Sequence, residues 1–273
     1  MTELFKTVLI LSVFGFVITV VLLCLKPITA KKFSARWQYY MWILVLAAMI
    51  VPVYKLIPEK EARKINTITP VYNFEIPEFN VTVEDIPVDT PQAQIEEKIS
   101  KPDINLFELS AYIWILGVFV YLFAVTLSYI VYIIKKRKNS VILEYTEAIY
   151  EEKRELGIKR KIRVRISGDT SSPMLVGVLF PTVYIPAREI PTDNMRMVFL
   201  HELMHYKRKD LLIKWLSLFV NAVHWFNPIA YLLRANISEA CEIACDMAVT
   251  KNMSEENRKL YMKTILDLVE EAK

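Results

Sequence analysis

The sequence predicts a membrane-embedded α-helical region followed by a small α+β domain. Of the 273 residues, 54% are apolar, and the mean hydropathy is +0.29, above what a soluble domain of ordinary composition shows. Three long uncharged stretches precede residue 138, and shorter strand and helix patterns follow it. We therefore expect a membrane region over 1–138 and a soluble domain over 139–273. This composition excludes disordered and collagen-like proteins and disfavours a purely soluble enzyme.

The uncharged stretches predict three transmembrane helices, over residues 7–25, 37–54 and 109–134. Each is close to the roughly 20 apolar residues that a span requires. The second has aromatic residues near its ends, as at a membrane interface: Trp37, Tyr39, Tyr40 and Tyr54. A signal peptide is the alternative for the first stretch. It is disfavoured because the apolar run is too long and no small-residue cleavage pattern follows.

Basic residues predict the orientation of these spans. The segment after the first span carries Lys26, Lys31, Lys32 and Arg36, and the third span ends in the basic run 135–138. Positive residues favour the cytoplasmic side. We expect an outside N-terminus, an acidic and proline-punctuated external loop over 57–105, and a cytoplasmic domain after 135. Sparse cysteines (Cys24, Cys241 and Cys245) fit a reducing compartment better than a disulfide framework.

The soluble domain is expected to begin with a helix, a small sheet and a second helix. The helical pattern runs over 139–157, and strict alternation over 161–166 predicts a half-buried strand with Ile162, Val164 and Ile166 on one face. Two short strands are expected over 174–178 and 182–185. Thr192 or Asp193 could then cap a helix that runs through His205, and Asn227-Pro228 predicts the start of a further helix.

The first of these long helices carries the motif His201-Glu202-Leu203-Met204-His205. Two histidines four residues apart lie on one helix face, where both imidazoles can bind one Zn²⁺. Glu202 lies beside that face and could act as the general base toward a water molecule on the metal. The alternative is a solvated histidine pair next to a glutamate, which the preceding apolar run 197–200 disfavours.

A catalytic zinc site needs a third protein ligand, and the chain offers four candidates: His224, Glu239, Glu242 and Asp246. We expect Glu242 to be the ligand, with Glu239 as its main competitor. Asp246, one turn further on, could support a ligand imidazole from behind. His224 lies in an aromatic segment typical of a packed residue. Cys241 and Cys245 are interpreted as buried thiols rather than ligands.

Residues 215–233 carry no formal charge and are long enough for a fourth span. A span there would put Glu242 across the bilayer from His201 and His205, so one ion could not bind all three. We therefore expect this stretch to bend back near Asn227-Pro228, as a helix hairpin or a segment at the membrane surface. The basic run 207–209 before it favours a position at the anionic inner leaflet.

These motifs together resemble the BlaR/MecR family of membrane zinc metalloproteases. The resemblance rests on motifs that occur in order along nearly the whole chain: Ser172-Pro173, Gly177, Pro181, Ile185-Pro186, HELMHYKRKD, Trp225-Phe226-Asn227-Pro228, Glu242 and Asp246. It implies a gluzincin-like domain in which His201, His205 and Glu242 match the zinc ligands and Glu202 the catalytic base. It also implies that the strand 174–178 pairs with an extended peptide substrate.

The resemblance also implies a signalling role. In this family an extracellular sensor domain binds β-lactams, and the activated protease leads to cleavage of a DNA-bound repressor and to induction of antibiotic-resistance genes. This chain stops at Lys273, before a final span or sensor domain, so such a domain would lie outside it. The expected partners are a repressor or the chain itself as substrate, membrane lipid and a second copy of the chain, with no direct contact to nucleic acid. Two alternatives are a non-catalytic receptor with a structural metal and a membrane quality-control protease.

Overall fold

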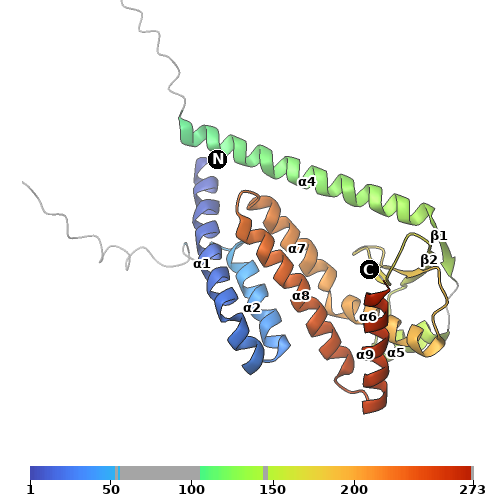
Figure 1. The fold of residues 1–273 in the computed structure, drawn as a ribbon. Coiled ribbons are helices and arrows are strands. Elements are labelled where there is room, and N and C mark those ends of the chain that lie inside the picture. Colours follow the sequence, from blue (N-terminus) through green and yellow to red (C-terminus); the bar gives the residue numbers. More distant parts are fainter. Residues whose placement is uncertain (53–54, 56–104, 144–146, 272–273) are drawn as a thin grey trace, which may run out of the picture.

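The computed structural model describes residues 1–52, 55, 105–143 and 147–271. The predicted external loop 57–105 lies almost entirely outside these residues. The described part consists of helices and one small sheet (Figure 1). Its helices are α1 (Thr2–Lys32), α2 (Ala35–Ala48), α4 (Leu106–Lys138), α5 (Glu147–Glu155), α6 (Thr192–Arg208), α7 (Asp210–Val223), α8 (Pro228–Thr250) and α9 (Glu255–Glu270).

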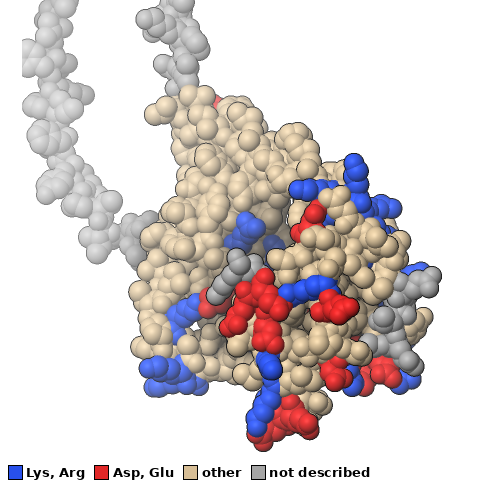
Figure 2. Space-filling model, turned by 45° about the vertical axis from the view of Figure 1, so that its right-hand side comes forward, with Lys and Arg blue, Asp and Glu red and all other residues tan. Residues whose placement is uncertain are grey.

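Two described helices, α1 and α4, are long and apolar enough to cross a membrane. Few residues of α4 are buried, so its apolar side chains face outward. The predicted second span, 37–54, is not confirmed. Helix α2 starts at the Ser34 cap and has 14 residues, which corresponds to about 21 Å and falls short of the hydrocarbon thickness of about 30 Å. Figure 2 shows the upper part of one face almost free of charged residues, with acidic and basic side chains gathered below.

The N-terminal ends of α1 and α4 meet, and the two helices then diverge (Figure 1). Phe5 packs against Phe107 and Trp114, with ring centroids 5.5 and 5.6 Å apart. The antiparallel pair α7 and α8 lies between the diverging helices. This confirms the predicted bend in residues 215–233. Asn227 caps α8 by accepting a hydrogen bond from the backbone of Ile229, and Pro228 occupies the first helical position, where its missing N–H costs nothing.

The tip of this hairpin is fixed to both long helices. Asn227 Nδ2 donates to Ser12 Oγ of α1 at 2.8 Å. Trp225 Nε1 donates to the carbonyl of Trp114 at 3.2 Å, and Trp114 Nε1 donates to the carbonyl of Val223 at 2.8 Å. The Trp225 ring lies so close to Gly117 that a Cβ there would collide with it. Helices α1 and α4, which precede the motif 201–205, are therefore joined at this point to the hairpin that follows it.

The sheet has the order β1-β2-β4-β3, with β2 and β4 parallel and the other pairs antiparallel. Its strands are β1 (Ser140–Leu143), β2 (Arg163–Ser167), β3 (Met174–Val176) and β4 (Thr182–Pro186). The expected strands are confirmed to within a few residues. The expected helix over 139–157 is wrong in its first part, because 140–143 pairs with β2 and helix α5 starts at Glu147. Strand β1 contains the β-branched pair Val141-Ile142, which favours a strand, but its four residues are too few to show a clear alternation of apolar and polar positions.

One face of the sheet packs on α6. Val164, Val183 and Ile185 form a buried cluster with Phe199 and Leu203 of the helix. The expected cap by Thr192 or Asp193 is wrong: Thr192 is the first helical residue, and Pro191 precedes it without a side-chain hydrogen bond. Helix α6 ends where Lys209 adopts a left-handed conformation with φ of 62°. The chain then turns directly into α7, which brings the next residues back under the motif.

Candidate metal centre

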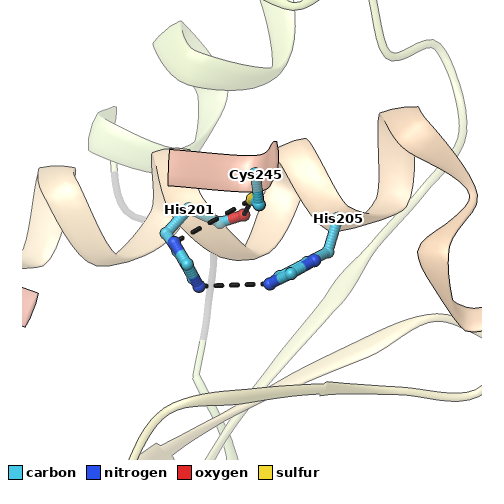
Figure 3. Close-up of side chains that lie close together, drawn as sticks. All are labelled: His201, His205 and Cys245. Carbon is cyan, nitrogen blue, oxygen red and sulfur yellow. Dashed lines mark hydrogen bonds between the residues drawn. The ribbon is translucent and has the colours of Figure 1, made fainter. Parts of the chain in front are cut away.

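The two motif histidines lie side by side on α6, with their rings nearly perpendicular. Their Nε2 atoms face one another at 3.1 Å (Figure 3). Both side chains are largely buried, with exposed fractions of 12% for His201 and 7% for His205. The spacing of one helical turn brings the rings together, and burial holds them there.

Glu242 of α8 completes a triangle with these nitrogens. Its Oε2 lies 3.1 Å from His205 Nε2 and 3.7 Å from His201 Nε2. Ligand atoms about 2.0–2.1 Å from a tetrahedral zinc ion lie roughly 3.3–3.4 Å from one another. The three atoms are therefore spaced as zinc ligands would be, although they come from helices 37 positions apart in sequence.

Hydrogen bonds behind the rings determine which imidazole nitrogen carries the proton. Tyr261 of α9 donates to Asp246 Oδ1 at 2.6 Å, so its oxygen accepts from His201 Nδ1 at 2.7 Å. His205 Nδ1 donates to Asp210 Oδ2 at 2.8 Å. With both protons on Nδ1, both Nε2 lone pairs point into the triangle. Two lone pairs and a carboxylate oxygen at this distance require a positive charge between them.

The pKa shifts of the two histidines and of Glu242 also favour a positive charge at this site. Burial lowers the pKa of each imidazole, but hydrogen bonds to carboxylates outweigh burial, so the pKa of His201 is raised and the pKa of His205 rises to about 11. Burial raises the pKa of Glu242, and hydrogen bonds to the two histidines outweigh it and lower that pKa. The residues present therefore fit a divalent cation, which would replace the protons.

Glu202 lies next to this triangle but outside it. Its side chain is buried, and burial raises the pKa of its carboxyl group. The backbone of Leu175 in β3 hydrogen-bonds to it. Glu202 lines a cavity of about 420 Å³ together with His201, His205 and Glu242. A carboxylate of raised pKa at the wall of a cavity is suited to accept a proton near neutral pH.

The other sequence candidates lie elsewhere or take other roles. Glu239 is paired with Lys26 of α1 at 2.7 Å. His224 is buried and donates from Nε2 to the carbonyl of Met49 at 3.1 Å. Cys241 is buried in an apolar cluster with α2. Of the four candidates for the third ligand, the structure therefore brings Glu242 to the Nε2 atoms and Asp246 to the far side of His201.

Cys245 lies nearer the histidines than the sequence indicated. Its sulfur is within the distance at which it could share an ion with His201 and His205 (Figure 3). However, Sγ lies 3.9 Å from His201 Nδ1, on the side of the ring that faces Tyr261. Sγ also donates to the backbone carbonyl of His201 at 3.6 Å. The hydrogen bonds of Sγ are therefore on the Nδ1 and backbone side of His201, although the sulfur also lies close to His205.

Comparison with known proteins identifies the family. The profile of the BlaR1 peptidase M56 family matches residues 6–273. The chain belongs to this family. Membership makes it a metallopeptidase-type protein, which agrees with the cluster of His201, His205, Glu242 and Cys245.

Curated relatives of this M56 protein carry regulatory names. It is 36% identical over 156 residues to the regulatory protein BlaR1 of Bacillus licheniformis, covering 55% of the chain and 25% of the relative. It is 24% identical over 270 residues to the methicillin resistance mecR1 protein of Staphylococcus aureus, covering 94% of the chain and 45% of the relative. It is 23% identical over 280 residues to the regulatory protein BlaR1 of Staphylococcus aureus, covering 96% of the chain and 45% of the relative. The chain spans less than half the length of these relatives.

Sequence reasoning missed three residues of this M56 site. Asp210 follows His205 by five positions, past the end of α6, so helical spacing does not connect them. Tyr261 lies on α9, which carries no motif. Lys214 donates to Glu242 Oε1 at 2.9 Å and lines the cavity. Lys214 lies four positions after Asp210 on α7, which puts both residues on one face of that helix, but no motif in the sequence marks this face.

Two polar residues next to the motif, Tyr206 and Arg208, are engaged in other contacts. Tyr206 packs against the core between α6 and the sheet. Arg208 donates to Asp210 Oδ2 at 3.1 Å and to the carbonyl of Ala244 at 3.0 Å. Arg208 therefore holds Asp210 against His205.

Proposed function

We propose that this protein is a zinc endopeptidase of the gluzincin type. The observation that carries the proposal is the convergence of two imidazole lone pairs and one carboxylate oxygen next to a buried glutamate in a cavity. In this proposal His201, His205 and Glu242 hold the ion, and Glu202 is the general base. Asp246, Asp210 and Tyr261 hold the imidazoles in orientation from behind.

The chain's own residues account for the proton transfers. A bound zinc ion would polarise the scissile carbonyl and acidify water. Glu202 takes the proton from the attacking water and delivers it to the leaving amine nitrogen. Its raised pKa, caused by burial, makes the carboxylate a stronger base than an exposed glutamate.

The edge of the sheet supports binding of an extended peptide. Strand β3 is the last strand in the order and pairs with β4 on one side. On its other side, the backbone of Leu175 contacts Glu202, and Met174 and Leu175 line the same cavity as the histidines. A substrate strand added along this edge would bring its peptide bonds past Glu202 by β-augmentation.

Lys214 is the group that we propose to stabilise negative charge on the carbonyl oxygen during attack. Among the described residues that line the cavity it is the one with an ammonium group. Its Nζ lies 2.9 Å from Glu242 Oε1, next to the ligand triangle. A fixed cation in a water-poor site can lower the barrier where charge develops.

A closed, structural metal site is the alternative. Such sites have four protein ligands, whereas catalytic sites keep one position open. Cys245 could supply a fourth ligand only if its sulfur moved from the Nδ1 side of His201 to the side of Glu242. The observed side of the ring favours three protein ligands and therefore an open position.

We infer a membrane topology with the N-terminus outside and the peptidase domain in the cytoplasm. The basic last turns of α1 and α4 support this orientation. The names of the relatives support a signal-transducing role in β-lactam resistance. The substrate would then be a transcriptional repressor or the chain itself, and a sensor domain outside the chain would receive the signal.

The test is hydrolysis by the purified full chain in detergent. Wild-type protein loaded with zinc should cleave a candidate repressor or a fluorogenic peptide library, and Glu202→Gln protein should not. Both should retain zinc at one equivalent per chain. Equal cleavage by the two proteins would exclude the proposed base, and zinc retention without any cleavage would favour the structural alternative.

A further inference from the structure

A second cavity lies on the opposite face of the sheet from the metal centre. It has a volume of about 760 Å³ and lies between the end of α4, the start of α7 and strands β2 to β4. Arg163 pairs in register with Thr182, and Arg165 with Tyr184, so these four side chains share the face that looks away from α6. The cavity shares no lining residue with the metal centre.

One end of this cavity is cationic. Three guanidinium groups line it: Arg137, Arg163 and Arg165. Arg165 bonds to the carbonyls of Arg137 and Ser140 and to the hydroxyl of Ser140, which fixes it beside β1. Within the part of the chain that the structure describes, neither Arg137 nor Arg163 makes an ion pair, and the Arg163 guanidinium lies over the ring of Phe180, 5.8 Å from its centroid. Three like charges held together favour an anion between them.

The other end of the cavity is apolar and points along a membrane helix. Tyr129, Ile133 and Arg137 follow at intervals of four on α4, so the wall runs about 12 Å along the helix axis from the cations toward the apolar segment. Trp215 of α7 packs edge-on against Tyr129, with centroids 4.9 Å apart. Tyrosine and tryptophan at this level are typical of the membrane interface.

The loop between β3 and β4 extends this surface. Gly177 turns the chain with a φ of 91°, which places a backbone atom of Phe180 where a Cβ would lie. The next side chains, Leu179 and Phe180, are 70% and 69% exposed. Exposed apolar residues next to unpaired arginines fit contact with lipid rather than with water.

We propose that this cavity binds one anionic phospholipid of the inner leaflet, with its phosphate at Arg137 and Arg163 and an acyl chain along Tyr129, Ile133 and Trp215. The polarity of the cavity matches that of the lipid: the charged end lies at the basic end of α4, and the apolar end lies toward the span. The lipid would join α4 to β2, β4 and α7. The proposal is independent of the peptidase chemistry.

The direct test is native mass spectrometry of the full chain in detergent, titrated with phosphatidylglycerol, with phosphatidylcholine of the same acyl chains, or with inorganic phosphate. We expect one tightly bound phosphatidylglycerol, and roughly thirtyfold weaker binding to Arg137→Gln/Arg163→Gln protein, since each cation near an anionic lipid contributes about 1 kcal/mol, or roughly fivefold. The control is Arg154→Gln, an exposed arginine on α5 outside the cavity. It should bind as wild type does. Zinc content should be unchanged in all proteins.

Three results would overturn the proposal: equal binding of phosphatidylcholine, equal binding by the double variant, or inorganic phosphate that competes with the lipid at equal concentration. A second measurement avoids any dependence on folding of the variant. Wild-type protein in phosphatidylglycerol nanodiscs is photo-crosslinked with an acyl-chain diazirine analogue. Labelled peptides should include 129–133 or 212–215, and labelling confined to α1 and α2 would contradict the assignment.

Discussion

Asp210 Oδ2 accepts a hydrogen bond of 2.8 Å from His205 Nδ1, and the Asp210 side chain has no exposed surface. Arg208 contacts the same oxygen at 3.1 Å. This buried pair fixes the His205 ring so that Nε2 faces Glu242. Asp210, the first residue of α7, thus orients a histidine of α6, because the left-handed turn at Lys209 brings the start of α7 back to His205.

The first prediction concerns this pair. Asp210→Asn should weaken zinc affinity by about 10–100-fold, because an outer carboxylate orients and activates its ligand imidazole. Affinity is measured by competition with a chromophoric chelator. The matched control is Asp193→Asn, at an exposed position in the first turn of α6, which should leave the affinity unchanged. An unchanged affinity in a folded Asp210→Asn protein would show that the pair does not support the metal.

The second prediction separates the two glutamates of α8. Glu242→Gln should lose most of the bound zinc, because it removes the negative oxygen of the ligand triangle. Glu239→Gln should keep zinc, because Glu239 is engaged with Lys26 instead. Zinc per chain is measured by plasma mass spectrometry after dialysis. Loss of zinc in the Glu239 variant alone would reverse the ligand assignment.

The motif itself shows how far sequence alone can predict this site. The positions of His201, Glu202 and His205 follow from helical spacing, because all three lie on one helix and need no tertiary information. Placing any acidic residue of α8 beside the histidines required the additional argument that the segment 215–233 bends back, and this bend does not distinguish Glu242 from Glu239. That argument worked because Asn227-Pro228 is a strong local signal for a helix start.

The remaining parts of the site depend on tertiary packing that no local pattern encodes. Tyr261 reaches His201 from a helix 60 positions away, and Cys245 lies behind the same ring only because α8 packs on α6. The strand β1 was mistaken for helix because its four residues become a strand only through pairing with β2. The second span was predicted from the length of the uncharged stretch 37–54, whereas helix α2 ends at Ala48, because the absence of charge does not determine where a helix ends.

The third prediction concerns the general base. Glu202→Gln should retain zinc and lower kcat by about 10²–10⁴-fold, the usual contribution of a positioned base. The glutamine keeps the size of the side chain but cannot accept the proton. Zinc content and turnover of the same peptide are measured on one preparation. Loss of zinc in parallel with activity would mean that Glu202 is a ligand rather than the base.

The fourth prediction is a pH dependence of metal binding. The hydrogen bonds described above raise the pKa of His205 to about 11 in the metal-free protein. A raised pKa means that a proton occupies the site below that pH, so zinc must displace it and affinity must fall as the solution becomes more acidic. Between pH 6 and 9 the apparent zinc affinity should rise with pH, and zinc binding should release protons into a weakly buffered solution. A flat profile without proton release would contradict the proposed ligands.

The fifth prediction concerns the hairpin tip. Asn227→Ala removes the cap of α8 and the contact to Ser12, and loss of a cap costs about 1 kcal/mol. The melting temperature in detergent should fall, whereas Asn252→Ala, at an exposed position after α8, should leave it unchanged. An identical melting temperature in both variants would mean that the tip is held mainly by the packing of Trp225.

The central claim is that two histidines and a glutamate, and no cysteine, hold the metal. X-ray absorption at the zinc edge of the zinc-loaded full chain tests it directly, because Zn–S distances are about 2.3 Å and Zn–N or Zn–O distances about 2.0–2.2 Å. We expect only nitrogen and oxygen atoms bound to the zinc ion, with scattering from two imidazoles. A sulfur atom at the longer distance, lost in Cys245→Ala protein, would assign the site to His201, His205 and Cys245 and contradict the account.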